Sequence, residues 1–462
     1  MFVEFQGRKR SEPRNGAGGV DGVAVLPPST RVQQIDPELR DWLDLKSSLH
    51  EALLERLNLS VLDKVEESEL KRQIGGLIAQ LLVQQGRVLE PSRLQKLVEE
   101  LIFEVTGLGP LEPLLSDPTI NDILVNSHDN VYVERFGVLE KTSVQFRDEQ
   151  HLLRIIDKIV SAIGRRIDES QPWVDARLAD GSRVNAIIRP CAVDGPALSI
   201  RKFSRNPLTL ARLVEHGAMN DRAADLLRGL VQSRLNVLIS GGTGSGKTTL
   251  LNAMSAYISG KERVVTIEDA AELQLQQDHV VRLETRPASI EGTGAITQRD
   301  LVRNALRMRP DRIIVGEVRG AECFDMLQAM NTGHDGSMTT VHANTARDAL
   351  GRLEQMVTML GADIPARTIR GQIASALNVI VQLTRLSDGS RKIVSISEIV
   401  GMENDVVTLQ DIFVFRKTGK TESGQVLGEM FFTGIRPKFF DAFQAAGIET
   451  KGLLLGDRGK LE

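Results

Sequence analysis

The sequence predicts an α/β protein in which a large domain with a parallel sheet follows an α+β domain and a small helical bundle. Three observations support this fold class. Apolar residues recur at three- and four-residue steps in residues 34–105, short strands separated by Gly and Asp turns occupy 106–213, and strands alternate with helices in 214–425. A chain of 462 residues is also too long for one ordinary hydrophobic core.

The N-terminal part of the chain divides into two segments. Residues 1–33 are rich in Gly, Pro, Arg and polar side chains, a composition that predicts a disordered N-terminus. In the segment 34–105, Pro91 and Ser92 are expected to open the last helix, because proline suits the first turn of a helix. The helical bundle is predicted from apolar residues that share one helix face, namely Leu70, Ile74, Leu77, Ile78, Leu81 and Leu82.

The domain expected at 106–213 combines strands with one helix. Its strand-like segments are INDILVN, NVYVERFGVLEKTSVQF and DGSRVNAII, which lie around Gly and Asp turns. A helix is expected from Glu149 to Gly164, so this part is predicted to be an α+β domain.

After Asn236 the segments NVLISGG, RVVTIED, RIIVGEV and SMTTVHA are expected as strands with helices between them. Such alternation predicts a parallel sheet covered by helices on both faces. The stretch from VIVQLTR to DIFVFRK predicts further strands, and residues 426–462 are expected as a C-terminal extension.

The composition limits the class of protein. The formal net charge is −4, so no general field for binding nucleic acid is indicated, and 41% hydrophobic with 26% charged residues is ordinary for a soluble protein. No stretch approaches the roughly 18 apolar residues of a membrane-spanning helix, and no apolar segment of a signal peptide follows the N-terminus. Cys191 and Cys323 lie far apart and are expected as small buried residues in a reducing compartment.

The glycine-rich segment GGTGSGKTT lies between the apolar strand NVLIS and a predicted helix. Glycines allow backbone N–H groups to turn toward a polyphosphate, and the helix N-terminus adds partial positive charge. Lys247 is expected to reach the β- and γ-phosphates, and the Thr248 hydroxyl to bind Mg²⁺. The expected nucleotide-binding residues of this segment are Gly241, Gly242, Thr243, Gly244, Ser245, Gly246, Lys247, Thr248 and Thr249.

Two strand ends supply carboxylates for hydrolysis. Glu317 ends the strand RIIVGE, and ligands bind at the carboxyl edge of a parallel sheet. Gly316 occupies the position where an Asp usually precedes this Glu, so Mg²⁺ is expected to rely on Thr248, water and another acid. Glu268 or Asp269, at the end of a neighbouring strand, is expected to be a second catalytic or metal-orienting group, with a helix-capping Asp and an exposed Glu as the alternative.

Histidines and arginines follow the later strands. His334 and His342 flank SMTTVHA, where a neutral imidazole would sense the γ-phosphate, relay a conformational change or simply pack, and they lack companions at the spacing of a zinc site. The arginines of VVRLETRP and LVRNALRMRPDR either act on phosphates of a neighbouring subunit or belong to solvated faces. They are Arg282, Arg286, Arg303, Arg307, Arg309 and Arg312.

Five motifs occur together in the order GGTGSGKTT, TIEDAAELQL, VVRLETRP, LRMRPDRIIVGEVRG and AMNTGHDGSMTTVHAN. They resemble the Walker A, Asp, Walker B and His boxes of the type II/IV secretion ATPase superfamily. The segments GLGPLEPLLSDPTINDILVN, RRIDESQPWVDARLADGSRVNAI and DGPALSIRKF extend the resemblance to the CpaF, or TadA-type, ATPases of Tad/Flp pilus systems. The resemblance spans approximately Leu101 to Arg416.

The resemblance implies a PAS-like α+β domain followed by a RecA-like P-loop NTPase domain. Six subunits would form a ring, with ATP and Mg²⁺ at the cleft between the two domains. Glu317 and Glu268 would be the catalytic carboxylates, and Arg201 in LSIRKF would reach the γ-phosphate, with Arg183 near the expected place of a second such arginine. The phosphate-sensing or intersubunit residues would be Arg282, Arg286, His334 and His342.

The function that the resemblance implies is a cytoplasmic, ATP-hydrolysing motor for assembly of a Tad/Flp pilus. Its expected partners are ATP, further copies of the chain as a homohexamer, and inner-membrane platform proteins of the TadB and TadC type, which would hold it at the inner membrane. Neither zinc nor nucleic acid is expected. The chain lacks the four-cysteine zinc insert of type II secretion ATPases, and its helical segment before residue 105 differs from the short N-terminus of pilus retraction ATPases.

Three alternatives stay open at this point. The chain would instead be an ATPase of a type IV secretion system exporting DNA or protein, a nucleotide-gated scaffold that barely hydrolyses ATP, or a DNA-acting recombinase of the RecA type. Lys247, Thr248, Glu268 and Glu317 argue against the scaffold, and the near-neutral charge argues against the recombinase. Whether a pilus motor would drive extension alone or also retraction stays open too.

Overall fold

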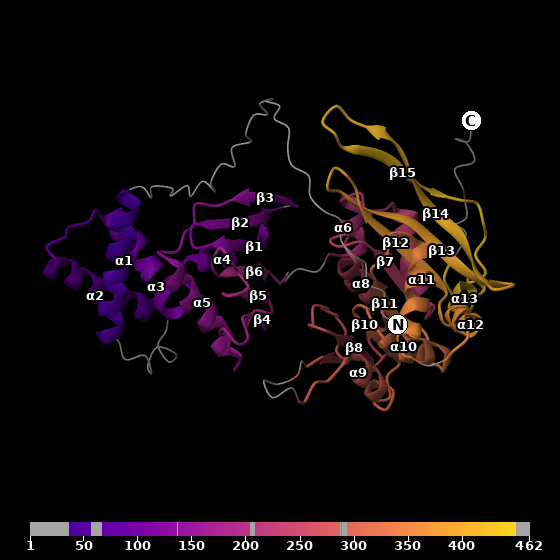
Figure 1. Ribbon diagram of the computed structural model, residues 1–462. Coiled ribbons are helices and arrows are strands. Elements are labelled where there is room, and N and C mark those ends of the chain that lie inside the picture. The colour runs from indigo at the N-terminus through magenta and orange to yellow at the C-terminus, as the bar shows by residue number, and fades with distance from the viewer. Residues whose placement is uncertain are drawn as a thin grey trace, which may run out of the picture. The chain divides into compact units, whose positions relative to one another are not determined.

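The computed structural model describes residues 37–56, 67–135, 137–203, 208–286, 288, 293–361 and 363–449. These residues form two compact units that divide between Thr106 and Gly107 (Figure 1). The segment 1–33, expected to be disordered, lies outside the described residues, and so do residues 450–462 of the expected C-terminal extension.

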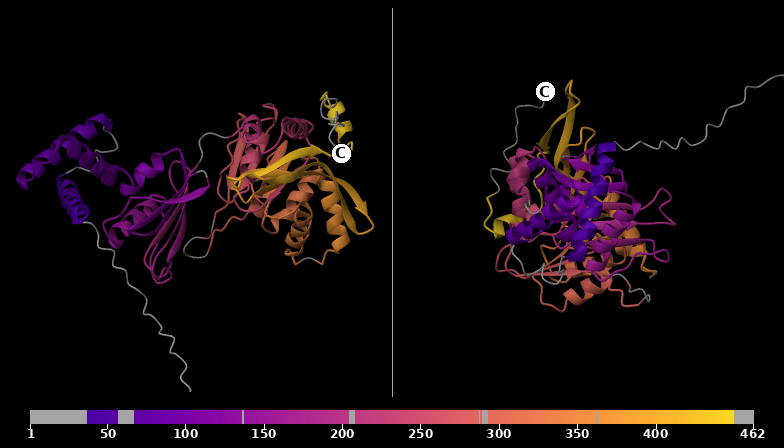
Figure 2. Two further views of the ribbon diagram at one scale, coloured as in Figure 1. Left: turned by 90° about the horizontal axis from the view of Figure 1, so that it is seen from above. Right: turned by 90° about the vertical axis from the view of Figure 1, so that its left-hand side faces the viewer.

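The described residues of the first unit form three helices, drawn from indigo to violet at the N-terminal end of the colour bar in Figure 2. They are α1 (Pro37–Arg56), α2 (Glu67–Gln84) and α3 (Pro91–Thr106). Leu49, Ile78 and Leu101 are fully buried in their shared core, as the apolar periodicity predicts. Helix α3 begins at Pro91, which confirms the predicted start.

The second unit begins with a six-stranded antiparallel sheet in the order β3-β2-β1-β6-β5-β4. Its core includes Ile123, Ile156 and Ile200, and the helix α5 (Glu149–Ala162) contributes its apolar face. The strands are β1 (Ile120–Ser127), β2 (Asn130–Arg135), β3 (Val138–Lys141), β4 (Trp173–Arg177), β5 (Arg183–Ile187) and β6 (Ala197–Arg201). The short helices η2 (Gly109–Leu111) and α4 (Glu112–Ser116) precede them.

A nine-stranded sheet follows, in the order β15-β14-β13-β12-β7-β11-β10-β8-β9. The six strands from β12 to β9 are parallel to one another, whereas the pairs β12–β13, β13–β14 and β14–β15 are antiparallel. The strands are β7 (Val237–Gly241), β8 (Val264–Glu268), β9 (Val280–Glu284), β10 (Arg312–Val315), β11 (Met338–Val341), β12 (Val379–Arg385), β13 (Arg391–Glu403), β14 (Val406–Lys420) and β15 (Val426–Phe432). The predicted parallel sheet is confirmed, and the strands added at its end make the whole sheet mixed.

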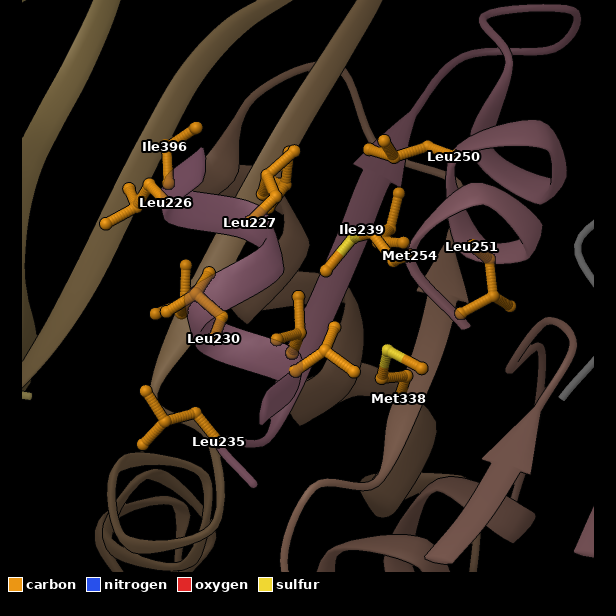
Figure 3. Close-up of a cluster of buried hydrophobic side chains, with 14 of the residues drawn as sticks. Leu226, Leu227, Leu230, Leu235, Ile239, Leu250, Leu251, Met254, Met338 and Ile396 are labelled. Carbon is orange, nitrogen blue, oxygen red and sulfur yellow. The ribbon is translucent and has the colours of Figure 1, made fainter. Parts of the chain in front are cut away.

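Helices cover both faces of the parallel part, as the alternation of elements predicts. Figure 3 shows one face, where Leu227 of α7 and Leu251 of α8 pack with Ile239 of β7. On the other face Leu238 packs with α9 to α12, because successive side chains of a strand point to opposite sides. The helices of this domain are α6 (Leu210–Glu215), α7 (Asp221–Gln232), α8 (Lys247–Ser255), α9 (Gln298–Ala305), α10 (Glu322–Asn331), α11 (Ala346–Thr358), α12 (Ala366–Ala376) and α13 (Phe440–Ala445).

The described residues after 425 share the core of the nine-stranded domain. Strand β15 pairs with β14, and Phe443 of α13 is fully buried in the same cluster as α7. The backbone N–H of Phe439 donates to the buried carboxylate of Glu398 at 3.1 Å. The segment expected as an extension therefore contributes a strand and a helix to this domain.

The two cysteines occupy different environments. Cys323 is fully buried on α10, and burial raises the pKa of its thiol above the usual range. Cys191 is exposed, so the expectation of burial is wrong for this residue. Its segment, between β5 and β6, is a turn rather than part of the core. In the part of the chain that the structure describes, no helix is both long and apolar enough to span a bilayer.

Candidate functional site

The glycine-rich loop of residues 241–247 is called the phosphate loop. It connects β7 to α8, in the strand, loop and helix order that the sequence predicts. Gly244 and Gly246 have φ values of +68° and +97°, a conformation that favours glycine because it has no Cβ atom. Gly241 is also constrained, since a Cβ atom there would lie 2.4 Å from Ser245 Oγ. Gly241, Gly244 and Gly246 are therefore required by the path of the loop, whereas a Cβ atom on Gly242 would meet nothing within 4 Å.

Lys247, the first residue of α8, folds back over this loop. Its Nζ donates to the carbonyl oxygens of Gly241 at 3.0 Å and Gly242 at 3.1 Å. Burial lowers the pKa of the ammonium, and the carboxylate of Glu317 opposes that shift. A partly desolvated cation that donates to two neutral carbonyls gains much from an anionic ligand, which fits a phosphate-binding role.

Glu317 lies half-buried directly after β10, whose carboxyl end meets the same sheet edge as the phosphate loop. Arg319 Nη2 donates to its Oε2 at 3.0 Å, and Nη1 of the same guanidinium lies 3.5 Å from Asp269 Oδ2. Burial raises the pKa of Asp269, and Arg319 counteracts this. One arginine thus connects the carboxylates that follow β10 and β8.

Glu268, at the end of β8, is 4% exposed. Its Oε2 accepts hydrogen bonds from the backbone N–H groups of Glu272 at 2.8 Å and Leu273 at 3.0 Å, while Oε1 is buried without a partner among the described residues. Burial raises the pKa of this carboxyl to about 7, although the two backbone hydrogen bonds lower it. The alternative of an exposed Glu at this position is therefore wrong.

The missing Asp before Glu317 has a steric explanation. A Cβ atom on Gly316 would lie 2.8 Å from Cγ of Glu268, which crosses from the adjacent strand. Real Cβ atoms essentially never make so short a contact, so the space for a side chain at 316 is filled by Glu268. The buried acid of this edge comes from β8 instead of β10.

Residues of the six-stranded sheet and of β8 to α10 enclose a cavity of about 1240 Å³. Arg201 and Arg286 both line it, but none of the described phosphate-loop residues does. Arg201 forms an ion pair with Asp122 at 3.1 Å, and Arg286 Nε donates to the carbonyl of Gly294 at 2.8 Å. The structure therefore brings these arginines to the carboxylate side of the site and not to the loop itself.

Two ion pairs join the six-stranded sheet to the nine-stranded sheet. Arg183 Nη1 lies 2.7 Å from Glu272 Oε1, and Arg177 Nη1 lies 2.7 Å from Glu284 Oε2. Arg177 also donates to the carbonyl of Ala271. Arg183, considered above as a second phosphate-reaching arginine, is therefore paired with Glu272, whose own backbone N–H donates to Glu268.

The other arginines of the two motifs differ in their surroundings. Arg282 is exposed on β9 and donates to the carbonyl of Ala271 at 3.3 Å. Arg303 lies 3.5 Å from Asp325, whereas Arg307 and Arg309 are exposed. Arg312 is neither a phosphate ligand nor solvated. It is 1% exposed and pairs with Glu262 at 2.7 Å, so its role is structural.

The two histidines lie at opposite ends of β11. His342 follows the strand, at the edge that carries the phosphate loop, and is exposed. His334 precedes the strand, and its Nδ1 lies 3.2 Å from the carbonyl of Ala329. The structure therefore places His342 on the sheet edge that carries the phosphate loop. It places His334 on the opposite edge, where its ring contacts the backbone of α10.

Three arginines near the site were not singled out from the sequence, namely Arg319, Arg385 and Arg391. Arg319 stands two residues after Glu317, close enough in the chain for its guanidinium to contact that carboxylate. Arg391 Nε donates to the carbonyl of Gly244 at 3.0 Å, and Arg385 Nη2 to that of Gly137 at 3.0 Å. These last contacts depend on the pairing of β12 with β7, which no local pattern reveals.

Comparison with known proteins identifies the family. The model of the family described as "Type II/IV secretion system protein" matches residues 104–426. A "Putative conjugal transfer protein" of Mycobacterium tuberculosis is 43% identical over 300 residues, which cover 64% of this chain and 85% of that protein. The conjugal transfer protein TrbB of Rhizobium radiobacter is 34% identical over 297 residues, 63% of this chain and 87% of its own.

A solved structure is also similar. The VirB11 ATPase of the Brucella suis type IV secretion system, in complex with sulphate, is 30% identical and aligns with 63% of this chain and 93% of its own, with a TM-score of 0.35. The family match alone covers more than half of the residues. This chain belongs to the type II/IV secretion system protein family.

Proposed function

We propose that this protein hydrolyses ATP at the edge formed by the phosphate loop, Glu268 and Glu317. The observation that carries the proposal is that a glycine-rich loop ending in Lys247 and two strand-ending carboxylates share one edge of a parallel sheet. In such sheets this edge is the usual site of ligand binding. Phosphoryl transfer needs little more than positioning and charge balance, and these residue types supply both.

The roles follow from the surroundings of each side chain. Lys247 would exchange its two carbonyl contacts for the β- and γ-phosphates. Glu317, half-buried and aligned by Arg319, would orient and deprotonate the attacking water. Glu268 has a carboxyl pKa of about 7, a value suited to exchanging a proton near neutral pH.

The site residues also fit Mg²⁺, which prefers oxygen donors. The Thr248 hydroxyl, at the start of α8, and the carboxylate of Glu268, with one buried oxygen that has no partner among the described residues, would hold it with the phosphates. The ion would neutralise charge on the β- and γ-phosphate oxygens. Gly316 cannot contribute an oxygen ligand from a side chain, whereas the buried carboxylate of Glu268 beside it can.

We further propose that the work done with this energy is assembly of a Tad/Flp pilus. The segments VDARLADGSRVNAI and LSIRKF, which form β4 to β6, carry the resemblance to the CpaF type. In this proposal six copies form a cytoplasmic ring that acts at the inner membrane through platform proteins of the TadB and TadC type. Nucleic acid is not expected as a partner.

A second candidate is an ATPase of a type IV secretion system, exporting DNA or protein. The names of the relatives favour it, because several are described as conjugal transfer proteins and others as VirB11 of type IV secretion systems. The phosphate loop and the carboxylates serve both candidates equally. The two candidate functions differ in what is moved, so they are distinguished by experiments in cells and not by assays of the purified protein.

The chemistry is tested with Lys247→Ala and Glu317→Gln. Lys247→Ala should reduce ATP turnover by about 100-fold or more, because it removes the charge that binds the phosphates. Glu317→Gln should bind ATP as the wild type does while turnover falls by at least about 100-fold, since the amide keeps the shape but cannot accept a proton. Arg367→Ala, in an exposed ion pair with Asp405, is the control and should retain activity. Activity near that of the wild type in either site variant would remove the assignment.

The cellular role is tested by deleting the gene and restoring it with the wild type or with Lys247→Ala. Pili counted by electron microscopy should disappear in the deletion and return only with the wild type. Transfer of a conjugative plasmid or of a secreted protein, measured in the same strains, should be unaffected. Normal piliation with lost transfer would favour the second candidate.

A further inference from the structure

We infer that the hairpin of β12 and β13 is a brace that positions the phosphate loop, with Arg391 as its positioning residue. The inference rests on the proposed binding of ATP at that loop. Arg391 is not one of the residues expected to touch the nucleotide. Its contact is with the outside of the loop, through a backbone carbonyl.

The brace is built on the pairing of β12 with β7. Gln382 lies opposite Ser240 and Leu383 opposite Gly241 in a parallel ladder, so β12 runs beside the strand up to the point where the loop begins. A Cβ atom on Gly241 would lie 2.8 Å from the carbonyl oxygen of Leu383. The first glycine of the loop and the end of β12 are thus in close contact, and neither can shift without the other.

Arg391 comes from the return strand of the hairpin. Its Nε donates to the carbonyl of Gly244 at 3.0 Å, and its Cδ lies 3.7 Å from the position that a Cβ atom would take on Gly246. It therefore contacts the loop at both glycines that have positive φ values. Within a trans peptide the C=O and the following N–H point in opposite directions. By holding the Gly244 carbonyl, Arg391 fixes the direction of the N–H of Ser245.

The direction of this N–H matters for an anion. The Ser245 N–H donates to the carbonyl of Gly242 at 3.4 Å, which is long for a backbone hydrogen bond. A phosphate oxygen would be a stronger acceptor for the same group. A loop whose peptide is already oriented loses less conformational entropy when the phosphates bind, so the contact should increase affinity.

The hairpin is itself rigid enough to serve as a brace. Leu386 N–H donates to the carbonyl of Ser390 at 2.7 Å, which closes the turn. Asp388 accepts from the N–H groups of Ser390 at 3.0 Å and of Val426 at 2.7 Å. The bond from Val426 is the largest cause that lowers the pKa of Asp388 to about 2, so this carboxylate is ionised at any working pH. The turn is thereby tied to β15.

A second arginine of the hairpin reaches the other sheet. Arg385 Nη2 donates to the carbonyl of Gly137, in the turn between β2 and β3, and Nη1 lies 3.7 Å from the Cβ position of Gly244. The guanidinium thus lies between the phosphate loop and the six-stranded sheet. This anchors the brace on the side away from β15.

The test measures the affinity of the full-length protein for ATP with Mg²⁺ by titration calorimetry, together with KM, kcat and the melting temperature. Arg391→Ala should weaken binding by about fivefold, or about 1 kcal/mol, because one exposed hydrogen bond to the loop is lost. KM should rise to the same extent while kcat at saturation changes less than about twofold. Arg391→Lys, which keeps the charge and moves the donor, should lie between Arg391→Ala and the wild type.

Arg416→Ala is the matched control. Arg416 lies on β14 of the same antiparallel ladder, and its guanidinium stacks over Phe431 at 5.4 Å instead of contacting the loop. This variant should bind ATP as the wild type does. Wild-type affinity in Arg391→Ala, or a fall in kcat with unchanged affinity, would overturn the inference. Failure of the wild type to bind ATP would instead refute the proposed function, which separates the two failures.

Discussion

The protonation of the Glu268 carboxyl is set by its surroundings. The carboxyl is buried at the end of β8, accepts hydrogen bonds from two backbone N–H groups on one oxygen and has no described partner on the other. The free energy needed to ionise a buried carboxyl raises its pKa, here to about 7. An acid in this state exchanges its proton near neutral pH, whereas an ordinary surface Glu is already ionised.

This pKa makes a prediction for stability against pH. The folded-state pKa of about 7 lies above the ordinary value of 4.5, so the folded protein holds the proton more tightly than the unfolded chain. The stabilising contribution is complete below pH 4.5 and is lost as the pH rises through 7. In Glu268→Gln the amide cannot titrate. The wild type should therefore lose up to about 3 kcal/mol of unfolding free energy between acid and alkaline pH that the variant does not lose.

Urea unfolding of both proteins at a series of pH values measures this difference. Taking the difference between two proteins removes the contributions of all other titrating groups, which they share. A constant offset is expected from placing an amide N–H₂ group in the buried site. A gap that does not change between pH 5 and pH 8 would show that Glu268 is ionised throughout, as a solvated Glu is.

The contact between Glu268 and Gly316 leads to a second prediction. Gly316→Ala places a Cβ atom 2.8 Å from Glu268 Cγ, so the variant should lose about 1–3 kcal/mol of stability through overpacking. Glu268→Ala removes the opposing side chain. In that background Gly316→Ala should cost much less, and the coupling measured by a double-mutant cycle should be of the same order as the single loss. Additive effects would show that the two residues do not compete for space.

The helices, strands and loops that were predicted correctly are those whose own residues specify them, through apolar periodicity, glycines or helix-end residues. The phosphate loop lies between β7 and α8 as expected, because its glycines and the apolar strand before it specify the conformation locally. Helix α3 begins at Pro91, and α5 covers Glu149–Ala162, close to the predicted range. In these segments periodicity and end signals agree.

Strands β4, β6 and β9 were not identified, and neither was β15. They are short or carry charged and polar residues at alternate positions, so their strand character comes from the neighbours with which they pair. For the same reason the contacts of Glu268 with Gly316 and of Arg391 with Gly244 were not predictable. Both join residues that are brought together only by the order of strands in the sheet.

The helix α13 supports a prediction about the C-terminal part of the chain. Phe443 is fully buried beside Gly229 of α7, where a Cβ atom would lie 2.4 Å from its ring. Phe443→Ala should cost about 3–5 kcal/mol of unfolding free energy, as for other large buried aromatic residues. Phe431→Ala, on the partly exposed β15, is the control and should cost less. A loss of less than about 1 kcal/mol for Phe443→Ala would mean that α13 is dispensable for the nine-stranded domain.

At the scale of the molecule, the two sheets of the second unit are joined by weak contacts. The pairs Arg177–Glu284 and Arg183–Glu272 are partly exposed, and such pairs contribute roughly 0.2–1 kcal/mol each. They are screened further by salt. In the proposed function, charge added or lost when ATP binds and is hydrolysed at the adjacent edge would be large enough to compete with these ion pairs and so to shift the two sheets against each other.

The proposed ring provides the last prediction. Arg282 and Arg286 are exposed in the single chain, and neither forms an ion pair with a described acid. A neighbouring subunit would give such cations a phosphate to neutralise, and a site completed in this way turns over only when the subunits are assembled. Activity per subunit should therefore fall on dilution, in step with the loss of the large particle measured by light scattering. Arg286→Ala should lower turnover in the assembled state, while Arg307→Ala, exposed on the same domain, should not. Turnover per subunit that stays constant while the particle falls to the mass of one chain would exclude a shared site, and the arginines would then be ordinary surface residues.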